Sequence, residues 1–411
     1  MNSDRIAITG MGVISPLGNS LTAYWDSLIN SRCGIRKIKN FDVSGLHTQI
    51  GGEVDNFSPT EYMEPKAVKR SARFTQFALA AADQAIRDSG IEINEKSHSD
   101  IGVYVGSGMC SLAEIENLAI IGVEKGISAW PIFASIRDCN HSPAFTIACH
   151  FKLTGPTITI SSACNSSSNA LEIALDQMRL SKVSKAIVIG TEALSSGGFK
   201  TICLSRSMSG RNDQPEKASR PFDRERDGFV MSEGAGAIVL EKLGDARKRA
   251  ADPYAVISGC ACTNDGYSIL KCEPNGIQIS RAMSKALADA KKDVSQISYV
   301  SAHGPSMPDT DRAETRAIKR TYGSCAPRLP ISSIKGALGS PIGATNLLQV
   351  IAMGKSIAEN MIPPTINLEY PDDECDLDYV PNEARELVVK CAMINSHAYG
   401  GGNTSIIMEK V

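Results

Sequence analysis

Residues 157–170 read TITISSACNSSSNA, and this stretch decides the fold. Ile158 and Ile160 alternate with threonines, which predicts a buried strand. The small residues after Ala163 permit a tight turn, and the apolar residues of 171–178 recur at helical spacing. The sequence therefore predicts a strand, a turn and a helix, with Cys164 where the strand ends and the helix begins.

This placement gives Cys164 two possible roles. A thiol at a helix N-terminus lies at the positive end of the helix dipole, which favours the thiolate and predicts a lowered pKa. The free backbone N–H groups of the first helical turn can hold a negatively charged oxygen. Cys164 is then a nucleophile that carries an acyl group as a thioester. Alternatively, it is one of twelve cysteines that pack as small buried hydrophobic residues. On these residues alone, both interpretations stay open.

The rest of the chain alternates between strand and helix patterns, which predicts an α/β protein. Strands are expected at 6–14, 101–106, 186–190, 237–240, 254–259, 297–302, 387–389, 392–395 and 404–408, and helices at 74–86, 277–290 and 311–322. Each half delivers a polar residue from the end of a strand, Cys164 in the first and His303 in the second. This indicates an internal duplication with the active site between residues 1–250 and 251–411.

Composition excludes several classes of protein. The formal net charge of −2 gives no support for nucleic-acid binding over the whole surface. No segment approaches the roughly 18 consecutive apolar residues of a membrane span, and the N-terminus lacks a signal-peptide pattern. The twelve cysteines form no CxxC pair and the six histidines are scattered, so no metal site is expected. We therefore expect reduced thiols in a cytoplasmic protein.

A series of further motifs follows the Cys164 turn. Residues 219–230 read SRPFDRERDGFV and 233–236 read EGAG; SAHG follows at 301–304, SIKG at 333–336 and NSHAYGGGN at 395–403. At these spacings the series resembles the elongating β-ketoacyl-acyl carrier protein synthases of the thiolase superfamily, over essentially the whole chain. The resemblance implies a thiolase-like α/β fold, a five-layered αβαβα structure of two similar halves.

The resemblance also implies roles for individual residues. Cys164 matches the nucleophile that takes the acyl chain from a carrier protein. His303 matches the catalytic histidine that hydrogen-bonds the malonyl thioester carbonyl and stabilises the enolate left by decarboxylation. Lys335 and Glu314 match a buried ion pair. The backbone N–H groups of Cys164 and Tyr399 match the oxyanion hole, and the Tyr399 ring stands at the position of the family's gating phenylalanine.

The chain departs from the family pattern at the second catalytic histidine. Five residues after Lys335, where that histidine is expected, the chain has Ser340 followed by Pro341. A hydroxyl is a shorter and weaker donor than imidazole and takes no charge near neutral pH. His397 replaces a usual phenylalanine; it either compensates for the missing imidazole or packs behind the gating loop.

A second departure concerns the phosphopantetheine arm of the carrier protein, the only prosthetic group that the resemblance implies. Pro305 and Met307 stand where threonines contact this arm, and Ser268 and Leu270 replace a histidine and a threonine in the facing loop. Each lost hydrogen bond is worth about 1 kcal/mol, so we expect the arm to bind with a different geometry or strength.

Other matched positions concern the acyl pocket and the protein partners. Met109 and Phe133 match the far end of the acyl pocket, with Phe133 reaching over from the partner of a dimer. The basic residues that match the docking surface for the acidic carrier protein are Lys66, Lys69, Arg70 and Arg206. The resemblance implies a homodimer formed through the strand before Cys164, with a heterodimer of related subunits as the alternative.

The sequence thus predicts a ketosynthase of a specialised fatty acid or polyketide pathway, in which Cys164 is acylated and then condenses with a malonyl unit. Two alternatives remain. The first is an acyltransferase that uses Cys164 and His303 without decarboxylation. The second is a non-catalytic subunit like a chain-length factor, which the presence of Cys164 disfavours.

Overall fold

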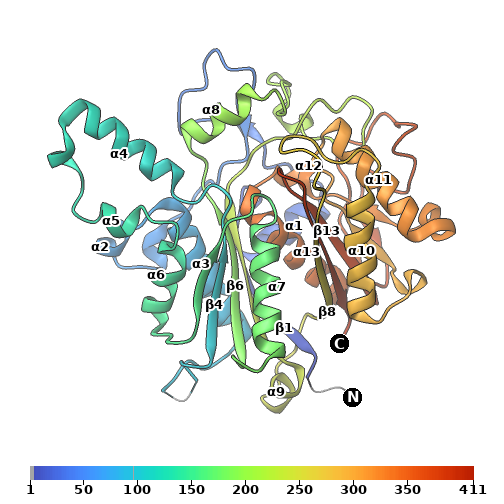
Figure 1. Cartoon of the computed structure of the whole chain (residues 1–411), viewed down its shortest axis with the longest axis horizontal. Helices are drawn as coiled ribbons and strands as arrows, with labels where there is room; N and C mark the ends of the chain where they lie inside the picture. Colours follow the sequence, from blue (N-terminus) through green and yellow to red (C-terminus); the bar gives the residue numbers. More distant parts are fainter. Residues whose placement is uncertain (1–3, 96) are drawn as a thin grey trace.

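The ten main strands form one continuous sheet. The computed structural model describes residues 4–95 and 97–411, and the strand order is β10-β9-β13-β14-β8-β1-β7-β6-β4-β5 (Figure 1). Their bounds are β1 (Ile6–Ile14), β4 (Ile101–Gly106), β5 (Thr157–Ile160), β6 (Lys185–Glu192), β7 (Gly234–Lys242), β8 (Ala255–Asn264), β9 (Tyr299–Ser301), β10 (Ile331–Ser332), β13 (Cys391–His397) and β14 (Gly402–Glu409).

This sheet consists of two halves with the same topology. In the first, β5, β4 and β6 are parallel, and β7 and β1 continue the sheet with antiparallel pairings. In the second, β10, β9 and β13 are parallel, and β14 and β8 follow in the same antiparallel manner. A short antiparallel pairing of β1 with β8 joins the halves. Cys164 follows β5 and His303 follows β9, so each half contributes to one site.

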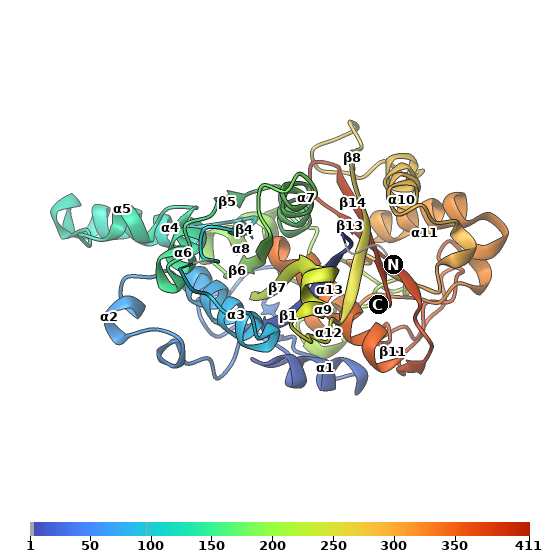
Figure 2. The ribbon, with the colours of Figure 1, turned by 90° about the horizontal axis from the view of Figure 1, so that it is seen from below.

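Three layers of helices enclose the two half-sheets. Helices α3 (Arg73–Ser89) and α6 (Ser142–Phe151) cover the outer face of the first half, and α10 (Ile277–Ala290) and α11 (Pro308–Tyr322) that of the second. Helices α7 (Ser166–Arg179) and α13 (Thr345–Glu359) lie in the middle. Figure 2 shows α3 and α7 on opposite sides of β4 and β6. The predicted five-layered αβαβα fold is confirmed.

Two glycines in β1 explain how closely α3 approaches the sheet. A Cβ at Gly10 would lie 2.1 Å from the carbonyl oxygen of Ala85, and one at Gly12 would lie 2.0 Å from that of Ala81. The alanines of α3 have side chains small enough for this contact, and all of them are buried. The glycines of the first strand are therefore packing residues.

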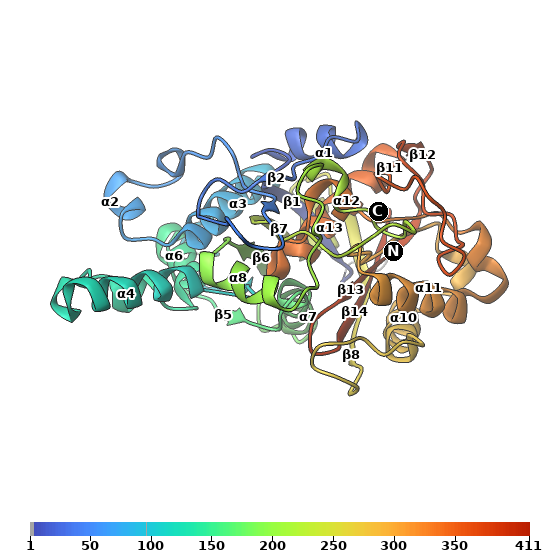
Figure 3. The same cartoon turned by 90° about the horizontal axis from the view of Figure 1, so that it is seen from above.

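The strand that precedes Cys164 is an edge strand, so its prediction as a buried strand is wrong. β5 pairs only with β4, and Ile158 is 37% exposed. Helices α4 (Leu112–Lys125) and α5 (Ala134–Arg137) project from the same side of the molecule (Figures 1 and 3). Exposed apolar side chains gather on these helices, on the loop between them and on α6: Ile115, Val123, Ile132, Ile136 and Phe145. A strand and an apolar surface thus lie together at this edge.

Another secondary-structure prediction also fails: residues 387–389 are not a strand, because the pairing there ends with β12 (Arg385–Glu386), which faces β11 (Met361–Ile362). The remaining elements used below are α2 (Pro65–Val68), α8 (Ser196–Leu204) and α12 (Lys335–Leu338). No helix in residues 4–95 and 97–411 is long and apolar enough to cross a membrane.

Candidate active site

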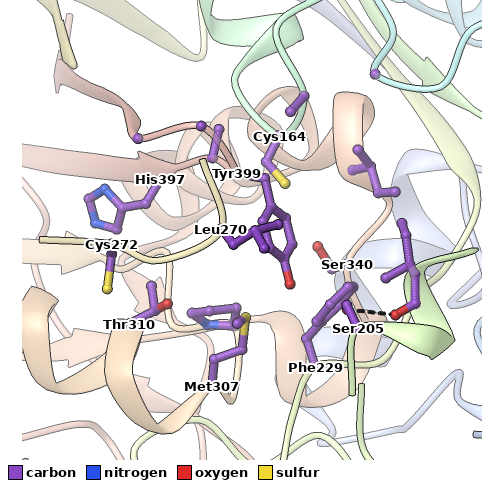
Figure 4. A pocket seen from close by; sticks show the side chains of 18 of the residues that line it. Cys164, Ser205, Phe229, Leu270, Cys272, Met307, Thr310, Ser340, His397 and Tyr399 are labelled. Carbon is purple, nitrogen blue, oxygen red and sulfur yellow. Dashed lines mark hydrogen bonds between the residues drawn. The ribbon is translucent and has the colours of Figure 1, made fainter. Parts of the chain in front are cut away.

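A cavity of about 450 Å³ lies between the two halves (Figure 4). Cys164, His303, Ser340 and Tyr399 line it, together with Met109, so the fold brings these five predicted site residues into one pocket. The remaining lining is mostly apolar and includes Phe229, Ile269, Leu270, Pro305, Met307 and Ile342. An apolar pocket with a few convergent polar groups suits a substrate that has an acyl chain and one reactive centre.

A strained turn presents Cys164 to this pocket. Ala163 has a φ of 52°, a conformation that alanine rarely adopts. The Ser166 hydroxyl bridges the turn: it donates to the Ala163 carbonyl (2.6 Å) and accepts from the Ser162 N–H (2.9 Å). Behind the turn, a Cβ at Gly106 of β4 would lie 2.3 Å from the backbone of Ser166. The small residues of this stretch therefore let the strand, the turn and α7 meet closely.

Burial, rather than the helix dipole, dominates the acidity of the thiol. Desolvation raises the pKa of Cys164 to about 11, and Lys335 and the backbone N–H of Tyr399 offset this only in part. The prediction of a lowered pKa is wrong, because the loss of hydration destabilises the thiolate more than the nearby positive groups stabilise it. Cys164 rests as the neutral thiol.

We expect the alkylation of Cys164 by iodoacetamide to be slow and to rise about tenfold per pH unit between pH 6 and 9. Below its pKa, a thiol forms thiolate in proportion to the hydroxide concentration. Peptide mapping of the modified Cys164 at a series of pH values measures this slope, with the exposed Cys149 as internal reference. A rate that is independent of pH in this range would indicate a thiolate already formed at pH 6.

His303 and Lys335 are in direct contact. The Lys335 ammonium donates to the carbonyl oxygen of His303, and its Nζ lies 3.3 Å from the Nδ1 of the ring. An ammonium facing Nδ1 favours a ring with a lone pair there and its proton on Nε2. Burial, Lys335 and His397 hold the pKa of His303 well below its usual value. His303 is therefore a neutral imidazole whose Nε2–H is free to donate.

The predicted ion pair between Lys335 and Glu314 is not formed. No ion pair within 4.0 Å joins these two side chains, which both lie in the described part of the chain. The Glu314 carboxylate instead accepts from the backbone N–H groups of His303 and Gly304, both at 2.9 Å, and faces His397. Burial lowers the pKa of Lys335 to about 8. Glu314 still raises the pKa of Lys335, so the two charges interact although their side chains are not in direct contact.

Ser340 and Tyr399 both line the pocket. The Ser340 backbone is held by hydrogen bonds with Val230 and Ser232, while its hydroxyl points into the cavity (Figure 4). The backbone N–H of Tyr399 faces the sulfur of Cys164. The Tyr399 ring extends between Cys164 and Phe229 (Figure 4).

The residues predicted for the acyl pocket and for carrier-protein docking lie at different places on the molecule. Met109 lines the cavity, and its Cε lies 2.7 Å from the position of a Cβ at Gly198 in α8. Phe133 lies outside the cavity, under the guanidinium of Arg70 (3.8 Å). The four basic residues Lys66, Lys69, Arg70 and Arg206 are all exposed. Three belong to α2 or follow it and Arg206 follows α8, and Figures 1 and 3 show these helices apart.

The sequence analysis missed Glu192, a fully buried carboxylate at the end of β6. It accepts from the backbone N–H groups of Gly108 (2.8 Å), Met109 (3.1 Å) and Gly343 (3.0 Å) and ties the Met109 loop to the second half. Burial raises its pKa to about 7. The signal was an acidic residue three positions after the apolar strand residues 186–189, since a charge buried at a strand end needs several donors.

We expect Glu192→Gln to lower the free energy of unfolding by about 2–3 kcal/mol, because an amide NH₂ would face backbone N–H groups that need an acceptor. Urea denaturation followed by circular dichroism measures this. The exposed Glu92→Gln is the matched control and should change stability by less than about 0.5 kcal/mol. An equally small effect at both positions would contradict the role given to Glu192.

No group of three histidine, cysteine, aspartate or glutamate side chains among the described residues is arranged to hold a metal ion. All twelve cysteines lie in the described part of the chain, and all are free thiols.

Comparisons with known proteins agree with this geometry. Residues 3–246 match the family model "Beta-ketoacyl synthase, N-terminal domain", and residues 254–369 match "Beta-ketoacyl synthase, C-terminal domain". The chain is 40% identical to a 3-oxoacyl-[acyl-carrier-protein] synthase 2 of Synechocystis sp., over 100% of this chain and 99% of that protein.

Two solved structures extend the comparison. One is a ketosynthase of a type II polyketide system, solved with its acyl-carrier protein and bound to the hexaketide (28% identity, TM-score 0.91). The other is the ishigamide ketosynthase/chain length factor (29% identity, TM-score 0.92). Each alignment covers 99% of both chains.

Proposed function

The chain belongs to the β-ketoacyl synthase family and is an acyl-transferring ketosynthase, and on this premise we propose how its own residues carry out the condensation. The observation that carries the proposal is the meeting of Cys164 and His303, from different halves of the fold, in one apolar cavity. One residue is placed to hold an acyl group and the other to assist a reaction beside it.

In the first step, the sulfur of Cys164 attacks the thioester carbonyl of an acyl carrier protein. The C–S bond of the donor breaks, the arm thiol leaves with the thiol proton, and the acyl group remains on Cys164. The negative oxygen of the tetrahedral intermediate is held by the backbone N–H groups of Cys164 and Tyr399.

In the second step, a malonyl thioester on the carrier protein loses CO₂. The electron pair of the broken C–C bond forms an enolate, and the Nε2–H of His303 donates to its oxygen. The enolate carbon then attacks the acyl carbonyl, a new C–C bond forms, and the Cys164 thiolate leaves and takes up a proton from water. Lys335 assists by fixing the tautomer of His303.

We propose that the acyl chain extends past Met109, and that the phosphopantetheine arm enters past Leu270, Pro305 and Met307. These apolar side chains offer the arm contact surface in place of hydrogen bonds. The exposed residues Lys66, Lys69, Arg70 and Arg206 are the proposed docking sites for an acidic carrier protein. The similar polyketide ketosynthase was solved with its acyl-carrier protein, which supports a carrier protein as the partner.

A Met109→Trp variant tests the proposed direction of the acyl chain. The indole fills the cavity beyond Cys164, so we expect short acyl groups to load normally and chains of eight or more carbons to load at least about tenfold more slowly. Intact-mass measurement of the acylated protein with carrier-bound chains of increasing length gives this ratio. An unchanged length profile would place the chain elsewhere.

We further propose that two copies assemble through β5 and the exposed apolar side chains around it. An edge strand and an apolar surface on the same side favour a two-fold contact between sheets. In such a dimer Phe133 of one copy approaches the pocket of the other. The similar structure of a ketosynthase/chain length factor supports the alternative, which is a heterodimer of related subunits. Light scattering on the purified protein separates a dimer of this chain from a monomer that needs another subunit.

Ser340 stands where the family resemblance implies a histidine, and this departure favours a specialised pathway of fatty acid or polyketide synthesis, which we propose is cytoplasmic. The test of the proposed function is incubation with acyl- and malonyl-loaded carrier proteins. We expect one molecule of CO₂ to be released for each molecule of β-ketoacyl product that forms. Transfer of the acyl group from Cys164 without CO₂ would identify the acyltransferase alternative. Full activity of a complex that carries Cys164→Ala would identify the chain-length-factor alternative.

A further inference from the structure

Helix α8 forms one wall of the cavity, and the mechanism above gives it no role. Three residues in this helix or directly after it line the cavity, namely Thr201, Ile202 and Ser205. The first turn of α8 contains two adjacent glycines, Gly197 and Gly198. Apart from proline, glycine is the least favourable residue inside a helix, so the start of α8 depends on contacts from other segments.

One set of these contacts comes from the segment that begins at Met109. A Cβ at Gly198 would lie 2.7 Å from Cε of Met109 and 3.1 Å from Cδ2 of Leu112, so the glycine lets this segment approach the helix closely. Met109 also lines the cavity. The start of α8 is therefore a surface against which Met109 packs.

Glu116 of α4 binds the same turn of α8 directly. Its Oε2 accepts a hydrogen bond from the backbone N–H of Gly197 (2.8 Å). The next N–H, that of Gly198, donates to the hydroxyl of Ser195 (3.0 Å). The first N–H groups of a helix have no partner within the helix, and the helix dipole favours a carboxylate beside them.

The carboxylate of Glu116 also packs closely against α8. A Cβ at Gly197 would lie 3.0 Å from the carboxyl carbon of Glu116, so a larger residue there would push the two helices apart. Figure 3 shows α8 next to α4. Glu116 thereby fixes the position of α8 relative to the segment that carries Met109.

We infer that Glu116 is a positioning residue that limits the length of the acyl chain, because it holds α8 against Met109. This inference rests on the proposed path of the acyl chain past Met109. Glu116 lies outside the cavity and acts through α8, so its loss leaves the reacting groups at Cys164 in place. Without this contact α8 and Met109 separate more easily, and the end of the cavity admits longer chains.

The test compares short and long acyl chains. We expect Glu116→Ala to raise the ratio of the Cys164 acylation rates with ten-carbon and four-carbon acyl carrier protein at least about threefold, with the four-carbon rate within about twofold of the parent. Glu116→Gln keeps an oxygen that accepts from Gly197 and should behave as the parent. Glu124→Ala, at an exposed position of the same helix, is the matched control.

A shorter carboxylate tests the reach of the contact. Glu116→Asp keeps the charge but is one methylene too short for the N–H of Gly197, so we expect the same change in ratio as in Glu116→Ala. This variant decides the question if the alanine variant does not fold.

A second pair of probes needs no carrier protein. N-ethyl and N-octyl iodoacetamide alkylate thiols directly, and peptide mapping gives their rates at Cys164. We expect the octyl-to-ethyl ratio to rise at least about threefold in Glu116→Ala and Glu116→Asp and to stay at the parental value in Glu116→Gln.

Unchanged alkylation ratios in both Glu116→Ala and Glu116→Asp would overturn the inference. A change in Glu116→Gln as large as that in Glu116→Ala would also overturn it, because the accepting oxygen would then be irrelevant. A parent protein that no acyl carrier protein acylates would instead refute the proposed function, and the alkylation ratios would still decide the role of Glu116.

Discussion

Cys164→Ala is expected to abolish formation of the acyl-enzyme and to lower the rate of condensation by about 10³-fold or more. No other side chain of the cavity offers a comparable nucleophile beside two free backbone N–H groups. Cys272 also lines the cavity, but it lies on a different loop and lacks this arrangement. The measurement is intact mass after incubation with acyl carrier protein, together with product formation.

The exposed Cys149 provides the control for this result. Cys149→Ala should acquire one acyl group at the parental rate, because the thiol that this variant lacks lies outside the cavity. An acyl adduct that persists in Cys164→Ala and maps to another cysteine would contradict the assignment of the nucleophile. Because alanine is smaller than cysteine and leaves the turn intact, we expect the melting temperature to change little.

His303→Ala is expected to separate the two half-reactions. Acylation of Cys164 should continue within about tenfold of the parental rate, while release of CO₂ from malonyl carrier protein should fall by about 10²–10³-fold. The reason is that His303 is a neutral Nε2–H donor, held in that tautomer by Lys335, and its contribution arises as the enolate forms. Single-turnover assays with pre-acylated enzyme measure the two steps independently.

His98→Phe serves as the control for the loss of a histidine. A His303→Ala variant that decarboxylates normally would show that another group stabilises the enolate. A variant in which acylation falls as strongly as decarboxylation would assign His303 to activation of the Cys164 thiol. These two results lead to different mechanisms, so the assay distinguishes them.

The secondary structure around the site residues was predictable from the sequence. The strand, turn and helix around Cys164 follow from alternating isoleucines and a run of small residues, and the structure has them at β5, the strained Ala163 and α7. His303 at the end of a strand was predictable in the same way. Such features depend on residues close together in the chain.

Interactions between distant segments were not predictable in this way. The exposed position of β5 depends on which strand ends the sheet, and the isoleucine pattern is the same for an edge strand and a buried strand. The partner of Glu314 is set by the relative positions of α11, α12 and β13, so the carboxylate lies beside His397 and not in contact with Lys335 as expected. The raised pKa of Cys164 reflects the depth of the cavity, about which the sequence carries no direct signal.

The central claim is that an acyl group held on Cys164 is consumed by a carbon nucleophile formed by decarboxylation. Enzyme pre-acylated on Cys164 is mixed with ¹³C-carboxyl-labelled malonyl carrier protein, and the intact mass and labelled CO₂ are followed together. The account predicts that each acyl group lost from Cys164 appears with one molecule of labelled CO₂ and one β-ketoacyl product. Loss of the acyl group without labelled CO₂, or an acyl-enzyme that persists, would contradict it.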